Sequence, residues 1–381
     1  MSVAAILLTV ETPLGHYTLA GVSPSELFRR AVSGLTSVVG QAATLGPETL
    51  PQLHHWVETG TQLVLLVRSD RPLLTDKTLQ ALLYGHQAKT GPLAPLDPAA
   101  IGVVPAACAD AHWLVGQLAQ AASAVTLDDL VSASGATPVA VPDPTECLAV
   151  DSLTSLADAE RILRQRINLR WMQAGVQLTD PATTYIHAAV TIGRGTCILP
   201  NTHLWGNTTV GDFCQIGPNS ILRDAQIGCQ CSVLASVVEG AIMEDGSDIG
   251  PFSHLRKGAR LCQGAHMGNF GEMKNSTLGP NSKMGHLGYL GDATVGANVN
   301  IGAGTITCNY DGEKKHPTII EDGAFIGSDT MLVAPVHIGA NAQIGAGSVV
   351  TRDVPAGAVA YGVPARIMRK ASGVTDRGFG S

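Results

Sequence analysis

The feature that most constrains the fold is a period of six in the second half of the chain. Single aliphatic residues recur there at every sixth position, and many are followed by glycine. The series consists of Ile192, Ile198, Leu204, Val210, Ile216, Leu222, Ile249, Leu255, Leu261, Met267, Val295, Ile301, Ile326, Leu332, Ile338, Ile344 and Val350. An α-helix repeats every 3.6 residues and a half-buried strand every two, so neither explains this spacing. The period is typical of a parallel β-helix, in which each hexapeptide forms one side of a triangular coil.

The repeat also predicts which side chains fill the coil. The aliphatic residue should point inward, and the residue two positions earlier is usually small, as at Cys214 and Cys231. Because one coil cannot bury its own face, stacking of successive coils supplies the core. The period breaks around 237–245, 269–283 and 308–318. We expect loops to leave the coil there, and loops on a rigid scaffold often carry function.

The first part of the chain has a different pattern. Apolar strand-like runs, VAAILLTV and TQLVLLVRSD, are each followed by a helix-patterned stretch. This alternation favours an α/β domain with a parallel sheet flanked by helices. An amphipathic helix from Leu156, with Gly175 suited to its C-terminal cap, would link the two parts. The predicted boundaries are an α/β domain over 1–155, a linker helix over 156–175, a β-helix over 176–370 and a flexible tail over 371–381.

Composition excludes several classes of function. The net charge of −7 provides no overall basic field for nucleic acid, so an anionic ligand must be bound locally. No apolar run reaches the roughly 20 residues of a membrane-spanning helix. The eight cysteines show no zinc-ligand spacing, which favours free thiols in a cytoplasmic protein.

Polar residues gather in three short stretches of the repeat region. "HLRKGA" contains Arg256, "GNFGEMKNS" contains Glu272 and Lys274, and a third stretch runs from His286 to Lys315. A single cation at a coil corner is ordinarily a solvated turn residue. Three cations in one short region, beside a histidine that lies between repeat aliphatics, instead favour a site for an anionic ligand.

These stretches carry a family resemblance. "NFGEMK", "GHLGYLGDA" and "NIGAGTITCNYDG" resemble the acetyltransferase part of the bifunctional enzymes that make UDP-N-acetylglucosamine. Those enzymes join a glucosamine-1-phosphate N-acetyltransferase to an N-acetylglucosamine-1-phosphate uridylyltransferase. The resemblance is close from Ile249 to Asp353 and recognisable from Gly175 onward. It implies a left-handed β-helix, a homotrimer and active sites between subunits.

The resemblance also implies roles for individual residues. His286 would be the general base that deprotonates the amine as it attacks acetyl-CoA, and Glu272 would hold the amino group or polarise the base. The residues implied for the sugar phosphate are Arg256, Lys274, Tyr289, Asn300, Asn309, Tyr310 and Lys315. Those implied for acetyl-CoA are Ala303, Ser328 and Ala346, with Arg366 a candidate for the phosphates of the coenzyme.

The first part departs from the family. The glycine-rich pattern L-x-A-G-x-G-T-x-M, which binds nucleotide phosphates after the first strand, is absent. Asp70 and Asp151 stand where the resemblance implies ligands of Mg²⁺, although Asp151 replaces an asparagine. We therefore expect a shortened, degenerate nucleotidyltransferase-like domain that has lost uridylyl transfer, with Mg²⁺ required only if that activity is retained.

The function expected from the sequence is acetyl-CoA-dependent N-acetylation of glucosamine 1-phosphate, a step of UDP-N-acetylglucosamine and peptidoglycan biosynthesis. Three alternatives stay open. The chain could also transfer UMP, could acylate a different amino sugar, or could be a non-catalytic scaffold.

Overall fold

The computed structural model describes residues 2–10, 14, 17–88, 91, 93–97, 104–141 and 143–369. The chain divides into two compact units, Met1–Arg164 and Gln165–Ser381. The predicted flexible tail, 371–381, lies outside the described residues. Within the described ranges, no helix combines the length and the apolar character needed to cross a bilayer.

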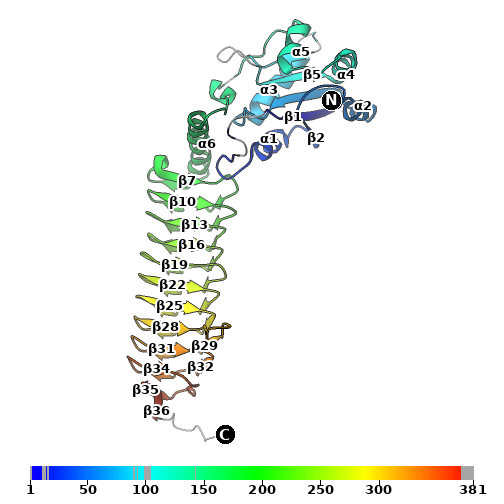
Figure 1. Ribbon diagram of the computed structural model, residues 1–381. Coiled ribbons are helices and arrows are strands. Elements are labelled where there is room, and N and C mark those ends of the chain that lie inside the picture. The colour runs from blue at the N-terminus through cyan, green and yellow to red at the C-terminus, as the bar shows by residue number, and fades with distance from the viewer. Residues whose placement is uncertain are drawn as a thin grey trace. The chain divides into compact units, whose positions relative to one another are not determined.

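The first unit is a five-stranded sheet with helices on both faces (Figure 1). The strand order is β2-β1-β3-β5-β4. Side chains of α2, α4 and α5 form one core against the sheet, and side chains of α1 and α3 form another. The elements are β1 (Val3–Leu8), α1 (Pro24–Val32), β2 (Val38–Ala42), α2 (Leu50–Glu58), β3 (Leu63–Arg68), α3 (Asp76–Ala88), β4 (Leu93–Pro95), β5 (Ala106–Asp110), α4 (Ala111–Gln120), α5 (Leu127–Ser134) and the 3₁₀ helix η1 (Pro144–Cys147).

The prediction of a parallel sheet is wrong at one strand. β1, β2 and β3 are parallel, but β5 runs antiparallel to both β3 and β4. The physical reason is the length of the connection between β4 and β5. It spans only residues 96–105, whereas a crossover between parallel neighbours needs roughly a dozen residues or more.

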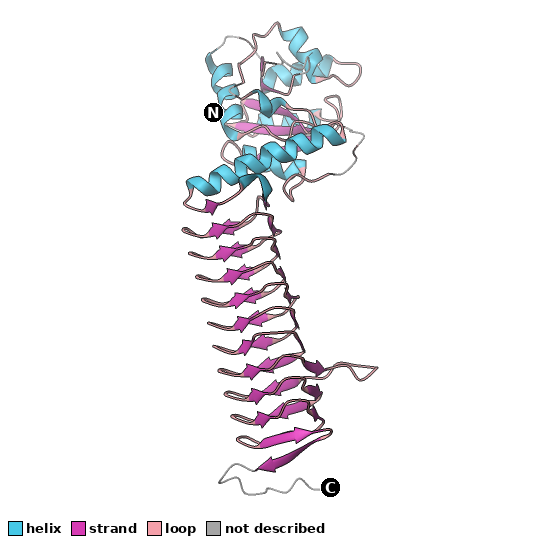
Figure 2. Ribbon diagram, turned by 90° about the vertical axis from the view of Figure 1, so that its left-hand side faces the viewer, coloured by secondary structure: helices cyan, strands magenta, loops and turns pink. Residues whose placement is uncertain are grey.

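The second unit is a parallel β-helix built from three sheets, which confirms the predicted fold class (Figures 1 and 2). Consecutive strands enter the three sheets in turn, so each coil contributes one strand to each sheet. Every aliphatic residue of the six-residue series is buried inside. Cys214 and Cys231 are each 2% exposed and occupy small inward positions, as predicted.

We name these sheets I, II and III. Sheet I contains β7 (Thr184–Ile186), β10 (Thr202–Trp205), β13 (Ile221–Arg223), β16 (Val237–Glu239), β19 (His254–Leu255), β22 (Gly271–Lys274), β25 (Gly288–Gly291), β28 (Thr305–Cys308), β31 (Met331–Val333) and β34 (Val349–Val350). Sheet II contains β8 (Thr191–Ile192), β11 (Thr209–Val210), β14 (Gln226–Ile227), β17 (Ile242–Met243), β20 (Arg260–Leu261), β23 (Thr277–Leu278), β26 (Ala293–Val295), β29 (Thr318–Ile320) and β32 (Val336–Ile338). Sheet III contains β6 (Gln177–Leu178), β9 (Cys197–Ile198), β12 (Gln215–Ile216), β15 (Ser232–Val233), β18 (Asp248–Ile249), β21 (His266–Met267), β24 (Lys283–Met284), β27 (Asn300–Ile301), β30 (Phe325–Ile326), β33 (Gln343–Ile344), β35 (Val359–Gly362) and β36 (Ala365–Arg369).

Two of the three predicted loops do not leave the coil. Residues 237–245 and 269–283 contain regular strands of sheets I, II and III. The period breaks there because some sides of the coil are five residues long, as from Val238 to Met243 and from Met273 to Leu278, and their inward residues remain buried. A protruding loop does lie between β28 and β29, as predicted, and Figure 2 shows it projecting from the coils.

The helix α6 (Leu153–Gln173) is present where an amphipathic helix was predicted. It begins three residues earlier than the predicted Leu156. Gly175 has φ +91°, a left-handed backbone conformation that glycine adopts readily just beyond a helix end. The short 3₁₀ helix η2 (Pro181–Thr183) lies before β7.

Candidate active site

His286 lies at the corner between β24 of sheet III and β25 of sheet I, and its side chain is exposed. The register of β21, β24 and β27 places Asn269 one coil before it and Ala303 one coil after it. The Nδ1 atom of His286 is 3.1 Å from Oδ1 of Asn269. An amide oxygen can only accept, so Nδ1 carries the proton and donates it. This leaves the Nε2 lone pair for a reacting proton, as a general base requires.

A carboxylate and a guanidinium meet on sheet I. Nη1 of Arg256 donates to Oε1 of Glu272 at 2.7 Å, and both side chains are 42% exposed. Glu272 pairs in register with Tyr289, so the phenol lies one coil farther along the same face. The structure thus brings together three of the predicted site residues on one face of the coil.

Two lysines add to this positive charge at the edge of sheet I nearest sheet II. The close approach of the Lys315 ammonium lowers the pKa of Lys274, and repulsion from Arg256 acts in the same direction. Asp292 partly offsets this repulsion. Arg256, Lys274 and Lys315 therefore lie close together and repel one another. A bound anion would relieve this repulsion.

Asn309 and Tyr289 converge above Gly291. Asn309 is only 7% exposed, and its Nδ2 donates to Oδ2 of Asp292 at 2.6 Å. A Cβ atom on Gly291 would lie 2.4 Å from Oη of Tyr289 and 2.7 Å from Nδ2 of Asn309. Glycine is therefore needed at position 291 to leave room for two predicted substrate-binding side chains.

The protruding loop returns Lys315 to this edge. Asp311 accepts from the backbone N–H groups of Glu313 and Lys314, each at 2.8 Å, and lies 2.6 Å from Nε2 of His316. These hydrogen bonds lower the pKa of Asp311. The bond from the Lys314 N–H has the largest effect, and the bond to His316 has the next largest. Tyr310 pairs with Lys315 across the base of the turn and is 60% exposed.

The base and the cations occupy opposite edges of sheet I. From Gly288 to Gly291, β25 takes three residue steps of about 3.3 Å, so the edges are about 10 Å apart. Glu272 and Tyr289 lie between them. Asn300 does not join this group within one chain, because it is exposed on β27 of sheet III.

The predicted coenzyme residues form a column on the corner that carries His286. Ala303, Ser328 and Ala346 lie in successive coils: the carbonyl of Ala303 accepts from the N–H of Asp329, and that of Ser328 accepts from the N–H of Gly347. Within the described part of the chain, their own N–H groups make no hydrogen bond. The column therefore presents a row of free backbone donors.

Arg366 lies at the end of this column farthest from His286. It pairs in register with Tyr361, whose Cβ would lie 2.7 Å from a Cβ atom built on Gly345. Gly345 immediately precedes Ala346. Arg366 is exposed, which leaves its guanidinium accessible.

Asp70 and Asp151 do not fit a magnesium site. Both carboxylate oxygens of Asp70 accept from Arg68, at 3.1 and 3.0 Å, and Nε of Arg71 is 3.8 Å away. Asp151 instead accepts from the hydroxyl of Ser155 at 3.2 Å. Among the residues the structure describes, no three His, Cys, Asp or Glu side chains are grouped to hold a metal ion.

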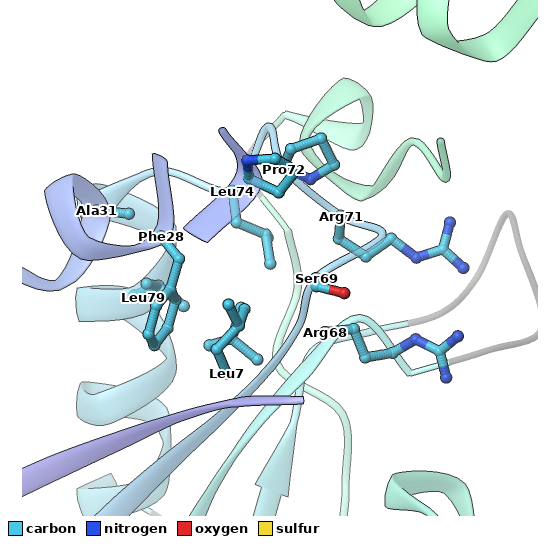
Figure 3. A pocket seen from close by; sticks show the side chains of 11 residues that line it. Leu7, Phe28, Ala31, Arg68, Ser69, Arg71, Pro72, Leu74 and Leu79 are labelled. Carbon is cyan, nitrogen blue, oxygen red and sulfur yellow. The ribbon is translucent and has the colours of Figure 1, made fainter. Parts of the chain in front are cut away.

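The neighbouring cavity is also too small for a nucleotide. Figure 3 shows Arg68 and Arg71 extending to the same side, away from apolar side chains that include Leu7 and Phe28. The cavity measures about 10 Å³. That volume holds about one water molecule.

Sequence reasoning missed three residues of the candidate site: Asn269, Asp292 and Gly291. The signal for two of them was the coil length of 17 residues. Asn269 precedes His286 by 17 residues, and Asp292 precedes Asn309 by the same number. Gly291 gave no such signal, because its role depends on where two neighbouring side chains end.

The repeat region of the chain matches a known family of hexapeptide-repeat proteins. Residues 189–224 and 317–352 match the family model described as bacterial transferase hexapeptide (six repeats). Among curated proteins, the chain is similar to the bifunctional protein GlmU. It is 50% identical to that of Heliobacterium modesticaldum over 218 residues, covering 57% of this chain and 48% of the relative. It is 48% identical to that of Thermotoga petrophila over 232 residues, covering 61% of this chain and 52% of the relative.

These findings confirm the resemblance drawn from the sequence for the acetyltransferase part. The chain spans about half the length of the curated relatives it matches.

Proposed function

We propose that the chain transfers the acetyl group of acetyl-CoA to the amine of glucosamine 1-phosphate. The observation that carries this proposal is the convergence of Arg256, Lys274 and Lys315 at one edge of sheet I, with the exposed imidazole of His286 at the opposite edge. Such a cluster suits a phosphate, and the imidazole suits an amine that must lose a proton. The similarity to GlmU, a bifunctional protein, supports the same reaction.

In this reaction the phosphate binds the cations, and the amino group lies toward Glu272 and His286. The bound ammonium first releases one proton to water. The amine nitrogen then attacks the thioester carbonyl carbon, a C–N bond forms and the C–S bond breaks. Coenzyme A leaves as the thiolate, and Nε2 of His286 takes the proton from nitrogen. Asn269 keeps Nδ1 protonated, so the lone pair stays on the reacting side.

Acetyl-CoA lies along the corner column in this proposal. The free N–H groups of Ala303, Ser328 and Ala346 donate to polar groups of the coenzyme. Arg366 binds its phosphates at the far end. Because the column begins next to His286, the thioester can lie at the base while the phosphates lie several coils away.

We further propose a homotrimer with sites between subunits. Asn300 lies on β27 of sheet III, apart from the site residues on sheet I, and Tyr310 is exposed on the protruding loop. A neighbouring subunit would bring them to the sugar. Eight unpaired cysteines are consistent with a reducing, cytoplasmic location.

The test is an acceptor screen with purified protein and acetyl-CoA. We expect free coenzyme A and N-acetylglucosamine 1-phosphate from glucosamine 1-phosphate, and slower transfer to UDP-linked amino sugars. A preference for another amino sugar would show that glucosamine 1-phosphate is not the substrate. Absence of transfer to any acceptor would refute the proposed acetyltransferase activity.

A parallel reaction tests the first unit. With UTP, Mg²⁺ and N-acetylglucosamine 1-phosphate, we expect no UDP-sugar, because Asp70 is neutralised by arginine. Formation of UDP-sugar at an enzymatic rate would show that this unit retains uridylyl transfer.

A further inference from the structure

The two residues assigned to opposite charges of the substrate are bound to each other. Arg256, proposed to bind the phosphate, donates to Glu272, proposed to hold the amino group, at 2.7 Å. The hydrogen bond to Glu272 is the largest of the effects that raise the pKa of Arg256. The unliganded site is therefore partly self-neutralised.

No other carboxylate is bonded to Arg256 in the described structure. Glu239 also acts on its charge. However, Oε2 of Glu239 is 3.2 Å from Nε2 of His254, and Oε1 is 3.7 Å from Nη1 of Arg223. Glu239 already has two partners, so Glu272 is the carboxylate that competes with a bound phosphate for Arg256.

We propose that this ion pair exchanges partners and thereby distinguishes the amine substrate from its acetylated product. The inference rests on the proposed function. The substrate carries both a phosphate and an ammonium group, so its phosphate takes Arg256 while its ammonium takes Glu272. Both members of the broken pair regain a partner of opposite charge.

The product carries only one of these charges. Acetylation turns the amine into a neutral amide, which cannot pair with a carboxylate. Glu272 then has no cationic partner in the ligand and competes with the product phosphate for the guanidinium of Arg256. The exchange favours binding of the substrate and release of the product from the same side chains.

A simpler model, in which Glu272 only attracts the ammonium, makes a different prediction. Removing its charge would then weaken substrate binding and leave product binding unchanged. Under the exchange, Glu272→Gln frees Arg256, so the product binds more tightly. The affinity of the product for this variant therefore decides between the two models.

The experiment is calorimetric titration of the full chain with glucosamine 1-phosphate and with N-acetylglucosamine 1-phosphate. In Glu272→Gln we expect product affinity to rise about 2- to 5-fold, the range for loss of a competing half-exposed ion pair. Substrate affinity should fall about 10- to 100-fold, as for a lost charged hydrogen bond. Unchanged or weaker product binding in a folded variant would overturn the proposal.

A double variant removes the remaining ambiguity. When Arg256→Gln is already present, adding Glu272→Gln should no longer tighten product binding, because no guanidinium remains to be freed. Tightening of the same size in that background would also overturn the exchange.

Glu244→Gln is the matched control. Glu244 forms a similar cross-coil pair with Arg260, but on sheet II. Its loss should leave both affinities unchanged, and a change equal to that of Glu272→Gln would mean that general charge, not the pair, sets the preference. Binding is measured without turnover, so absence of acetyl transfer by the native chain would refute the proposed function separately.

Discussion

Replacing Gly291 by alanine should damage the site without damaging the coil. The new Cβ would lie 2.4 Å from Oη of Tyr289, and ordinary contact begins near 3.4 Å, so the hydroxyl must move by about 1 Å. The other close atoms are Nδ2 of Asn309 and Cζ of Tyr289, each at 2.7 Å and each at the far end of a side chain. Such groups can move, so the fold should survive. A displacement of about 1 Å in a positioning group can cost roughly 10²-fold in rate.

We therefore expect kcat/KM for glucosamine 1-phosphate to fall about 10- to 100-fold, measured by chromatographic detection of the acetylated sugar. The thermal midpoint should stay close to that of the native chain. Gly34→Ala is a control, because a Cβ there meets nothing within 4 Å. Unchanged kinetics in folded Gly291→Ala would show that Tyr289 and Asn309 do not position the substrate.

Three further changes test other parts of the proposal. His286→Ala should lower kcat about 10²- to 10⁴-fold with little change in thermal midpoint, because the ring is exposed; a large loss of stability would instead indicate a structural role. Ile301→Asp should abolish the folded coil in circular dichroism, because Ile301 is 3% exposed and the carboxylate would have no partner; a native melting curve would contradict its inward position. The pKa of Lys274 is lowered from 10.5, and a bound phosphate raises it again, so phosphate affinity should fall as pH rises through the lowered value. Calorimetry in two buffers should then detect proton uptake on binding at alkaline pH, and equal heats in both buffers would refute this.

The sequence predicted the coil well, because burial in a β-helix repeats at nearly fixed intervals. The aliphatic series, inward cysteines and the loop after Cys308 all follow from that period. The sequence was a poor guide to strand orientation, which depends on the length of connections, and to side-chain pairing, which depends on local charge. The orientation of β5 depends on the length of a loop, and the sequence placed loops at 237–245 and 269–283 because five-residue sides resemble interruptions.

The magnesium ligands show a second limit. Asp70 resembles a metal ligand by its place after a buried strand, yet the residues on both sides of Ser69-Asp70 are arginines that reach its carboxylate. Pattern matching compares a position with a motif and ignores which neighbouring side chains fold back onto it. Arg68 and Arg71 were the signal in the sequence that the Asp70 carboxylate would be paired with cations.

The coil length explains how a site can be assembled from distant parts of the sequence. Stacking in register places residues 17 positions apart side by side, so Asn275, Asp292 and Asn309 form a ladder in which Asp292 accepts from both amides at 2.6 Å. The same offset links Asn269 to His286 and Glu272 to Tyr289. A residue inserted between Asp292 and Asn309 would shift one row of this ladder and break these contacts while leaving each motif intact. The spacing of the motifs is therefore as much a part of the proposed chemistry as the residues within them.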